Sequence, residues 1–283
     1  MASEGGRAMG GRAMIVDQAL TPFLRLPHFK GKTRIETFLR RLLWKPHGTQ
    51  VFGGVSMELD LAEWTQMQLL KRNWLEPRTL ELYGQLLRPG DVFVDVGAHV
   101  GFHSLVARKI VGPEGIVVCV EPQPYNAHKI LSNWRANGFA NLKLVVAAAG
   151  AKNGAVELSD QVLTDRSVLT LLERGGKNEA QKFEVPLVRL DSLLQRHELK
   201  TVKLLKLDVE GYELQVLHGA GARLGDIQNV VFEVLDAGNY ESTKPVVDLL
   251  EHAGFELLTI EGAPWNYGTE IMERNLWARR VSA

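Results

Sequence analysis

The sequence predicts an α/β protein built on a mostly parallel β-sheet, and three observations support this prediction. Apolar runs of strand length alternate with helical segments from residue 91 onward. Several of these runs, such as 116–120, are continuously apolar, as expected of strands buried between two layers of helices. The last two strands, 255–260 and 274–280, have no predicted helix between them and are expected to form an antiparallel hairpin.

The order of elements predicts a seven-stranded sheet with helices on both faces. Between the strands, the pattern predicts helices and one less regular segment, residues 150–200. The expected strands are 91–97, 115–121, 141–147, 202–208, 229–235, 255–260 and 274–280. The expected helices are 102–111, 124–137, 211–219 and 241–253.

The N-terminal quarter differs in character from the rest of the chain. Residues 1–14 carry Gly-Gly-Arg-Ala-Met twice in tandem and are expected to be a disordered leader. Residues 15–75 are expected to form an extension containing an amphipathic helix over 34–44 and a hairpin over 50–61. Residues 76–283 form the expected main domain, which opens with a helix that ends before Pro89-Gly90.

Composition excludes some classes of function. The chain of 283 residues carries 33 basic and 33 acidic residues, so its formal net charge is zero and gives no global attraction to nucleic acid. The single cysteine, Cys119, lies in an apolar run and is expected to be a small core residue. We expect a cytoplasmic protein without a membrane span, because no stretch is long and apolar enough to cross a bilayer.

The first strand of the main domain ends in the pattern Asp95-x-Gly97-x-His99-x-Gly101. A strand followed by a glycine turn and a helix is typical of a nucleoside-binding crevice. The dinucleotide fingerprint Gly-x-Gly-x-x-Gly is not met, because His99 and Phe102 stand where its second and third glycines belong. His99 is expected at positive φ, where histidine is among the enriched non-glycine residues.

An acid at the end of the second strand completes the pattern. Glu121 follows the apolar run 116–120 and is placed to accept hydrogen bonds from ribose hydroxyls. Alternatives remain for both acids: Asp95 as a cap of the helix near Phe102, and Glu121 as a solvated strand-end residue.

Another predicted strand, 202–208, ends in Asp208 and is followed by Glu210 and Glu213 around the glycine turn at Gly211. Because ligands bind outside the carboxyl ends of parallel strands, Asp208 is expected to face the same crevice as Gly97.

These segments resemble, in order and spacing, the FkbM family of S-adenosylmethionine-dependent methyltransferases. The similarity covers roughly residues 70–260, and the main departure is His99, where the family more commonly has Asn. The segments that carry it are Asp95 to Gly101, Glu121-Pro122, Val188 to Leu194 and Leu205 to Glu213.

The resemblance implies a Rossmann-like fold, S-adenosylmethionine as cofactor, and O-methylation of a sugar, glycan or secondary metabolite. A small-molecule or glycan acceptor is the expected partner, and nucleic acid is not. The residues expected to bind the cofactor are Asp95, Gly97, His99, Gly101, Glu121, Pro122 and Ala148.

The acceptor hydroxyl must lose its proton to a positioned base or bind a metal ion. Asp208 is the leading candidate for base or orienting group, with Glu210 beside it and Glu233 at the end of the next strand. Asp208 and Glu233 also offer the oxygen ligands that Mg²⁺ prefers, although this reading is not favoured, since Glu210 could instead cap the next helix.

Other assignments stay open at this stage. His99 or His103 could serve as the base, although the default places His103 on a helix surface. Asp191 is more simply a helix cap, residues 163–176 are a candidate lid, and aromatic residues could line an acceptor pocket: Trp64, Trp74, Trp265 and Tyr267.

Two further classes of function compete with a small-molecule enzyme. An RNA or protein methyltransferase is one alternative, in which the basic face of the predicted helix over 34–44 would dock the nucleic acid. A simpler expectation is that this helix packs on the main domain with its basic face in solvent. A non-catalytic nucleotide-binding module is also compatible with this fold, because fold does not fix function.

Overall fold

The computed structural model divides into two compact units, Met1–Leu75 and Glu76–Ala283. It describes residues 76–160, 169–170, 181–235 and 240–281, with parts of the first unit: 31–32, 34–35, 38, 48–52, 54–59 and 66.

The first unit contains the predicted hairpin. Strands β1 (Gly48–Phe52) and β2 (Val55–Leu59) pair antiparallel, with Phe52 opposite Val55. The predicted leader and most of the predicted helix over 34–44 lie outside the described residues.

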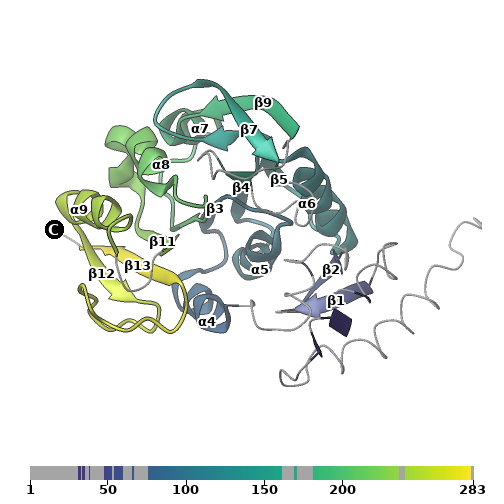
Figure 1. Ribbon diagram of the computed structural model, residues 1–283, viewed down its shortest axis with the longest axis horizontal. Coiled ribbons are helices and arrows are strands. Elements are labelled where there is room, and N and C mark those ends of the chain that lie inside the picture. Colours follow the sequence, from purple (N-terminus) through teal and green to yellow (C-terminus); the bar gives the residue numbers. More distant parts are fainter. Residues whose placement is uncertain are drawn as a thin grey trace, which may run out of the picture. The chain divides into compact units, whose positions relative to one another are not determined.

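The second unit confirms the predicted Rossmann-like α/β fold (Figure 1). Its seven-stranded sheet has the order β12-β13-β11-β10-β3-β4-β5, and β13 runs antiparallel to both of its neighbours. The strands are β3 (Val92–Val96), β4 (Ile116–Val120), β5 (Leu142–Val145), β10 (Leu204–Leu207), β11 (Asn229–Glu233), β12 (Phe255–Thr259) and β13 (Asn275–Arg280). The helices are α4 (Pro77–Leu86), α5 (Phe102–Val111), α6 (Pro124–Ala136), α7 (Leu190–Arg196), α8 (Glu213–Ala220), the 3₁₀ helix η1 (Gly221–Asp226) and α9 (Lys244–His252).

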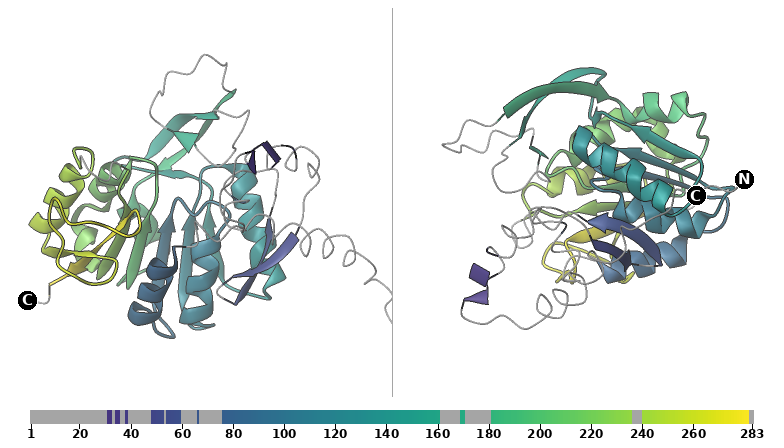
Figure 2. Two further views of the ribbon diagram at one scale, coloured as in Figure 1. Left: turned by 60° about the horizontal axis from the view of Figure 1, so that its bottom comes forward. Right: turned by 90° about the vertical axis from the view of Figure 1, so that its right-hand side faces the viewer.

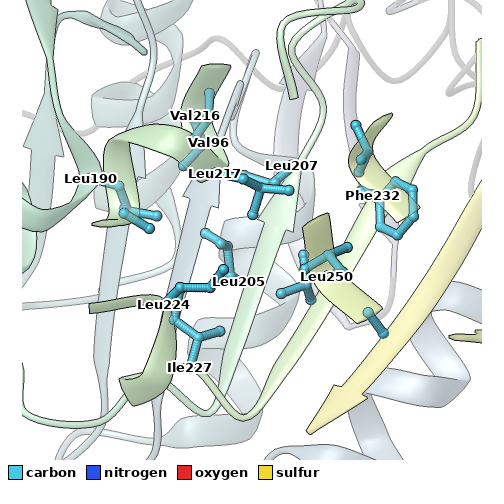
Figure 3. Close-up of a cluster of buried hydrophobic side chains, with 14 of the residues drawn as sticks. Val96, Leu190, Leu205, Leu207, Val216, Leu217, Leu224, Ile227, Phe232 and Leu250 are labelled. Atoms are coloured by element: carbon cyan, nitrogen blue, oxygen red, sulfur yellow. The ribbon is translucent and has the colours of Figure 1, made fainter. Parts of the chain in front are cut away.

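Successive side chains along each strand point to opposite faces of the sheet. In parallel register, Leu205 lies opposite Val94 and Lys206 lies opposite Asp95. Leu205 and Val94 belong to the hydrophobic core that includes residues of α7, α8 and α9, as Figure 3 shows for ten labelled side chains. The other face is covered by α4 and α5, where the Tyr83 and Phe93 rings pack with their centroids 5.3 Å apart and their planes tilted by 59°. The predicted cover of helices on both faces is therefore confirmed.

The ends of the helices follow from local chemistry. Helix α6 begins with Pro124, and the Gln123 side chain accepts hydrogen bonds from the Tyr125 and Asn126 backbone N–H groups. Helix α5 ends at Gly112, whose φ of 68° suits glycine. Within the described residues, no helix is long and apolar enough to cross a membrane.

The expectation of a less regular segment over 150–200 is wrong. This region forms most of a second sheet of order β6-β9-β7-β8, followed by α7. The long strands β7 and β9 pair antiparallel and rise away from the main sheet in Figure 2. The bounds of these strands are β6 (Ala148–Ala149), β7 (Gly154–Asp160), β8 (Leu169–Thr170) and β9 (Gln181–Val188).

The central strand β10 gives a direct test of the packing. Leu205 is completely buried, so Leu205→Ala is expected to lower the free energy of unfolding by about 2–5 kcal/mol in a urea titration. Val281→Ala, at a side chain that is 57% exposed, is the control and should change it by less than about 0.5 kcal/mol. Equal effects of the two substitutions would contradict this arrangement of the core.

Candidate active site

The candidate site lies where the order of strands reverses direction. From β3 the chain proceeds outward to β4 and β5, whereas β10 and β11 lie on the other side of β3. Ligands of open α/β sheets bind at such a switch point, outside the carboxyl ends of the strands. The residues after β3 and β10 therefore meet at the edge where a ligand is expected.

The turn after β3 approaches the end of β10 so closely that glycine is required. A Cβ atom added to Gly97 would lie 1.8 Å from the backbone oxygen of Asp208. Gly97 also has a φ of 84°, a conformation that L side chains rarely adopt. The Asp208 backbone N–H donates to the Val96 carbonyl oxygen at 3.0 Å and fixes the two strand ends together.

The rest of the turn also has positive φ angles, of 50° at His99 and 86° at Gly101. The expectation for His99 is confirmed. A Cβ atom on Gly101 would lie 3.1 Å from the Ile130 side chain of α6, so the turn packs tightly against that helix. The Gly97 N–H donates to the Val120 carbonyl oxygen of β4 at 2.9 Å.

Glu121 lies buried beneath this turn and is only 4% exposed. Its Oε2 atom accepts the His99 backbone N–H at 2.8 Å, and its Oε1 atom accepts the Gln123 N–H and the Asn126 amide. Burial raises the pKa of Glu121 to about 7, against the opposing effect of these three donors. The alternative of a solvated strand-end acid is therefore wrong, and Pro122 continues from this acid toward α6.

Asp95 is buried one residue before the end of β3. Its Oδ2 atom accepts the Ser104 hydroxyl at 2.5 Å, while Oδ1 has no hydrogen-bond partner among the described residues. Burial raises the pKa of Asp95, and the ammonium group of Lys206 opposes this rise. Gly101 occupies the N-cap position of α5 and makes no side-chain cap bond, whereas Asp95 interacts with both the hydroxyl and the backbone of Ser104 in the first turn of that helix, so the capping alternative stays open.

Asp208, Glu210 and Glu233 gather at the ends of β10 and β11. One carboxylate oxygen from each lies within 4.8 Å of the others. Lys206 Nζ donates to Asp208 Oδ2 at 2.7 Å. Burial would raise the pKa of Asp208, but the charge and hydrogen bond of Lys206 outweigh it, so the pKa is lowered.

Glu233 has the opposite protonation preference. Burial, together with the neighbouring charges of Asp208 and Glu210, raises the pKa of Glu233 to about 9. At neutral pH the Glu233 carboxyl group is therefore protonated and able to donate its hydrogen bond to the Asp208 carboxylate.

This trio is the one cluster within the described part of the chain that has the geometry to hold a metal ion. A cation at this trio would lie beside the Lys206 ammonium, however. Lys206 holds Oδ2 of Asp208, and Glu233 is hydrogen-bonded to the same carboxylate. We therefore assign no Mg²⁺ site to Asp208 and Glu233.

On the α4 and α5 face, His103 lies with two polar residues that the sequence did not single out, Glu76 and Tyr83. His103 is not a helix-surface residue, because Nδ1 contacts the Tyr83 hydroxyl at 3.1 Å and Nε2 contacts Glu76 Oε2 at 3.3 Å. Burial, and then the charge of Lys206, hold the pKa of His103 well below its usual range. Burial raises the pKa of Glu76 to about 7. The sequence feature that could have indicated buried polar partners on this face is Lys206, a charged residue inside the otherwise apolar strand β10.

Other candidates have structural roles or stay untested. Glu213 accepts the Val209 and Gly211 N–H groups at 3.2 Å, and α8 is capped at Tyr212, so Glu210 is not its cap. Glu210 adopts a φ of 53° at the crevice.

Asp191 pairs with Arg189 in the first turn of α7 and does not occupy the N-cap position, which belongs to Arg189. Ala148 is buried in β6, directly after the end of β5, and its role beside adenine stays a prediction.

The predicted aromatic wall is only partly described. Trp265 and Tyr267 contact each other and Tyr240 edge to face, and Trp265 and Tyr240 belong to the main hydrophobic core. Trp64, Trp74 and, apart from Leu169–Thr170, the candidate lid over 163–176 lie outside the described residues.

Comparison with known proteins identifies the family. A sequence model of the methyltransferase FkbM domain matches residues 95–257, which is more than half of the chain. The chain belongs to the FkbM methyltransferase family. It is 30% identical over 243 residues to the 31-O-demethyl-FK506 methyltransferase FkbM of Streptomyces tacrolimicus, covering 77% of this chain and 91% of the relative.

Two further proteins are similar to this chain at lower identity. Methyltransferase 1 of Beauveria bassiana is 26% identical over 62% of this chain and 77% of its own length. The crystal structure of methyltransferase FkbM from Methylobacillus flagellatus has 14% identity and a TM-score of 0.44, covering 95% of this chain and 59% of that one.

The close approach at Gly97 predicts the effect of a single methyl group. Gly97→Ala is expected to destabilise the fold by more than about 2 kcal/mol, because the turn must move away from the Asp208 carbonyl and a left-handed alanine costs about 1–2 kcal/mol by itself. Gly84→Ala, inside α4 with open space around it, is the control and should stabilise the protein by about 0.5–1 kcal/mol. Chemical denaturation of both variants checks this, and a neutral Gly97→Ala would contradict it.

Proposed function

We propose that this FkbM-family methyltransferase uses S-adenosylmethionine to methylate a hydroxyl group of a small metabolite or sugar. The observation that carries the proposal is the contact of the Gly97 turn with Asp208. It joins a nucleoside-binding turn and an ionised carboxylate at the switch point of one sheet.

The residues present fit the cofactor. Asp95 Oδ1 is a buried acceptor without a partner, as the ammonium group of a methionine moiety requires. Glu121 accepts three N–H donors, and a carboxylate has about four lone-pair sites, so one site is left for a ribose hydroxyl. The bound cofactor would supply an electrophilic methyl group for in-line transfer.

Asp208 is the proposed acceptor of the hydroxyl proton. Lys206 keeps it ionised, and its side chain retains 32% exposure, so an acceptor molecule can reach it. The bound cofactor would give up its methyl group to the acceptor oxygen and leave as the neutral thioether, and Asp208 would take the O–H proton. Glu233 and Glu210, beside Asp208, would orient the acceptor.

The identity of the acceptor atom is supported by a relative. The name of the Streptomyces tacrolimicus relative specifies methylation of 31-O-demethyl-FK506, which favours an oxygen acceptor. A neutral or cationic small molecule fits the acidic cluster better than the polyanionic backbone of RNA does. We also propose a cytoplasmic location, since the single cysteine, Cys119, is buried and unpaired in a disulfide.

The Glu121 carboxylate predicts a pH-dependent cofactor affinity. Because ribose hydroxyls donate to the ionised form, the affinity for S-adenosylhomocysteine is expected to rise with pH through about 7. Glu121→Gln should weaken binding roughly 10- to 100-fold above pH 8, since a hydrogen bond to a charged group contributes about 1.5–3 kcal/mol, and should remove this pH dependence.

Isothermal titration calorimetry between pH 6 and 9 measures both effects. Glu114→Gln, at an exposed position in the turn before β4, is the matched control and should bind as the unmodified protein does. A Glu121→Gln variant that keeps full affinity would show that Glu121 does not hold the ribose.

The proposed base predicts a separation of binding from turnover. Asp208→Asn should retain affinity for S-adenosylhomocysteine within a few fold, while methyl transfer falls about 10²- to 10⁴-fold, the usual contribution of a general base. Turnover is measured by mass spectrometry with methyl-labelled S-adenosylmethionine and a panel of hydroxylated macrolides and sugars.

Asp248→Asn, on the exposed face of α9, serves as the control and should leave turnover unchanged. Full activity of Asp208→Asn on an acceptor that the unmodified protein methylates would eliminate Asp208 as the base.

A further inference from the structure

Lys206 is the least expected residue of the central sheet. It is 1% exposed and lies in the middle of β10, between β3 and β11. Lysine is almost never fully buried unless its charge is paired, because the ammonium group loses its hydration. The neighbours of Lys206 must therefore compensate for a large desolvation cost.

The compensating groups come from every element packed around Lys206. Its own strand supplies Asp208, at 2.7 Å from Nζ, and β3 supplies Asp95, its cross-strand neighbour in the parallel register. Glu76, directly before α4, adds negative charge, whereas Glu233 at the end of β11 is protonated at neutral pH. His103 of α5 also feels the Lys206 charge.

The balance of these effects keeps Lys206 charged. Burial alone would lower the pKa of Lys206, but Asp208, Glu76 and Asp95 reverse this effect and raise the pKa above its ordinary value. Lys206 is then charged at neutral pH. It acts in turn on the carboxylates around it, and Asp208 is the one to which it is hydrogen-bonded.

The geometry places Lys206 beside both halves of the crevice: it is hydrogen-bonded to Asp208, and Asp95 is its cross-strand neighbour. Asp95 lies in β3 just before the turn that is proposed to hold the cofactor, and Asp208 is proposed to receive the acceptor proton. Both side chains project toward the α4 and α5 face, because their positions on the strands have the same parity as Lys206.

We infer that Lys206 is a positioning residue of the methyl-transfer site, which fixes Asp208 as the ionised, proton-accepting carboxylate next to Asp95 on the cofactor side. This inference rests on the proposed function, which assigns Asp95 to the cofactor side and Asp208 to the acceptor side. The Lys206 ammonium holds Oδ2 and so restricts the rotation of the Asp208 carboxylate, while the remaining lone pairs of that group stay available to a hydroxyl.

A purely structural role predicts a different outcome. A buried ion pair contributes little net stability compared with apolar residues of similar volume, so packing alone does not require a lysine in β10. If Lys206 only filled space, a methionine would replace it without changing the titration of Asp208.

The test is the pH titration of the Asp208 side chain by carboxyl ¹³C NMR, with the signal assigned by its loss in Asp208→Asn. In the unmodified protein we expect Asp208 to stay ionised down to about pH 4, close to or below the ordinary aspartate value of about 3.9. In Lys206→Met the midpoint should rise by at least about one pH unit, a tenfold change in proton affinity.

Two variants control this measurement. Lys206→Arg keeps the charge and should hold Asp208 ionised, whereas Lys203→Met removes an exposed lysine that is bonded to Gln228 and should change nothing. An Asp208 midpoint that moves by less than about 0.3 units in Lys206→Met would overturn the inference. If Lys206→Met does not fold, the titration of Asp208 in the unmodified protein is the test. An Asp208 carboxyl group that titrates above about pH 5 overturns the inference, and one that stays ionised down to about pH 4 supports it.

A parallel calorimetric titration with S-adenosylhomocysteine separates this inference from the proposed function. If S-adenosylhomocysteine fails to bind while Asp208 shifts in Lys206→Met, the cofactor assignment fails and the ionic coupling stands. If S-adenosylhomocysteine binds while Asp208 does not shift, the role of Lys206 fails alone.

Discussion

The contact between the Gly97 turn and the Asp208 carbonyl oxygen is the constraint on which the site depends. Because a Cβ atom at Gly97 would lie 1.8 Å from that oxygen, only glycine lets the ends of β3 and β10 come together. Their meeting point is also where the strand order reverses, so the turn and the acid share one crevice. The neighbouring Glu121 and Glu233 then reach the same edge from β4 and β11.

The ionisable groups at this edge differ in how their neighbours compensate for the cost of burial. Glu121 and Glu233 gain protons readily, with pKa values of about 7 and 9, whereas Asp208 remains ionised because Lys206 is bonded to it. Two neighbouring carboxyl groups thus hold different protonation states at neutral pH, an arrangement that separates a hydrogen-bond donor from a proton acceptor. Positive φ angles at His99 and Glu210 show that the backbone is also strained here, as at many functional sites.

Much of this architecture could be predicted from local patterns, and the failures have physical causes. Strand ends after apolar runs gave the positions of Gly97, Glu121 and Asp208, because sheet topology brings such ends together. The strand β9 was missed, although apolar and polar residues alternate along most of it. Pro186 lies within this strand, and a proline argues against a paired strand. The roles of Glu76 and His103 depend on contacts between α4 and α5, which no local pattern contains.

The measurement that tests this account most directly is a crystal structure of the full chain with S-adenosylhomocysteine. The account predicts that the ribose hydroxyls contact Glu121, the amino group contacts Asp95, and the sulfur atom points across the Gly97 turn toward Asp208. A ligand whose ribose lies away from Glu121, or whose sulfur is separated from Asp208 by the turn itself, would contradict the claim that one crevice at the ends of β3 and β10 holds both the donor and the base.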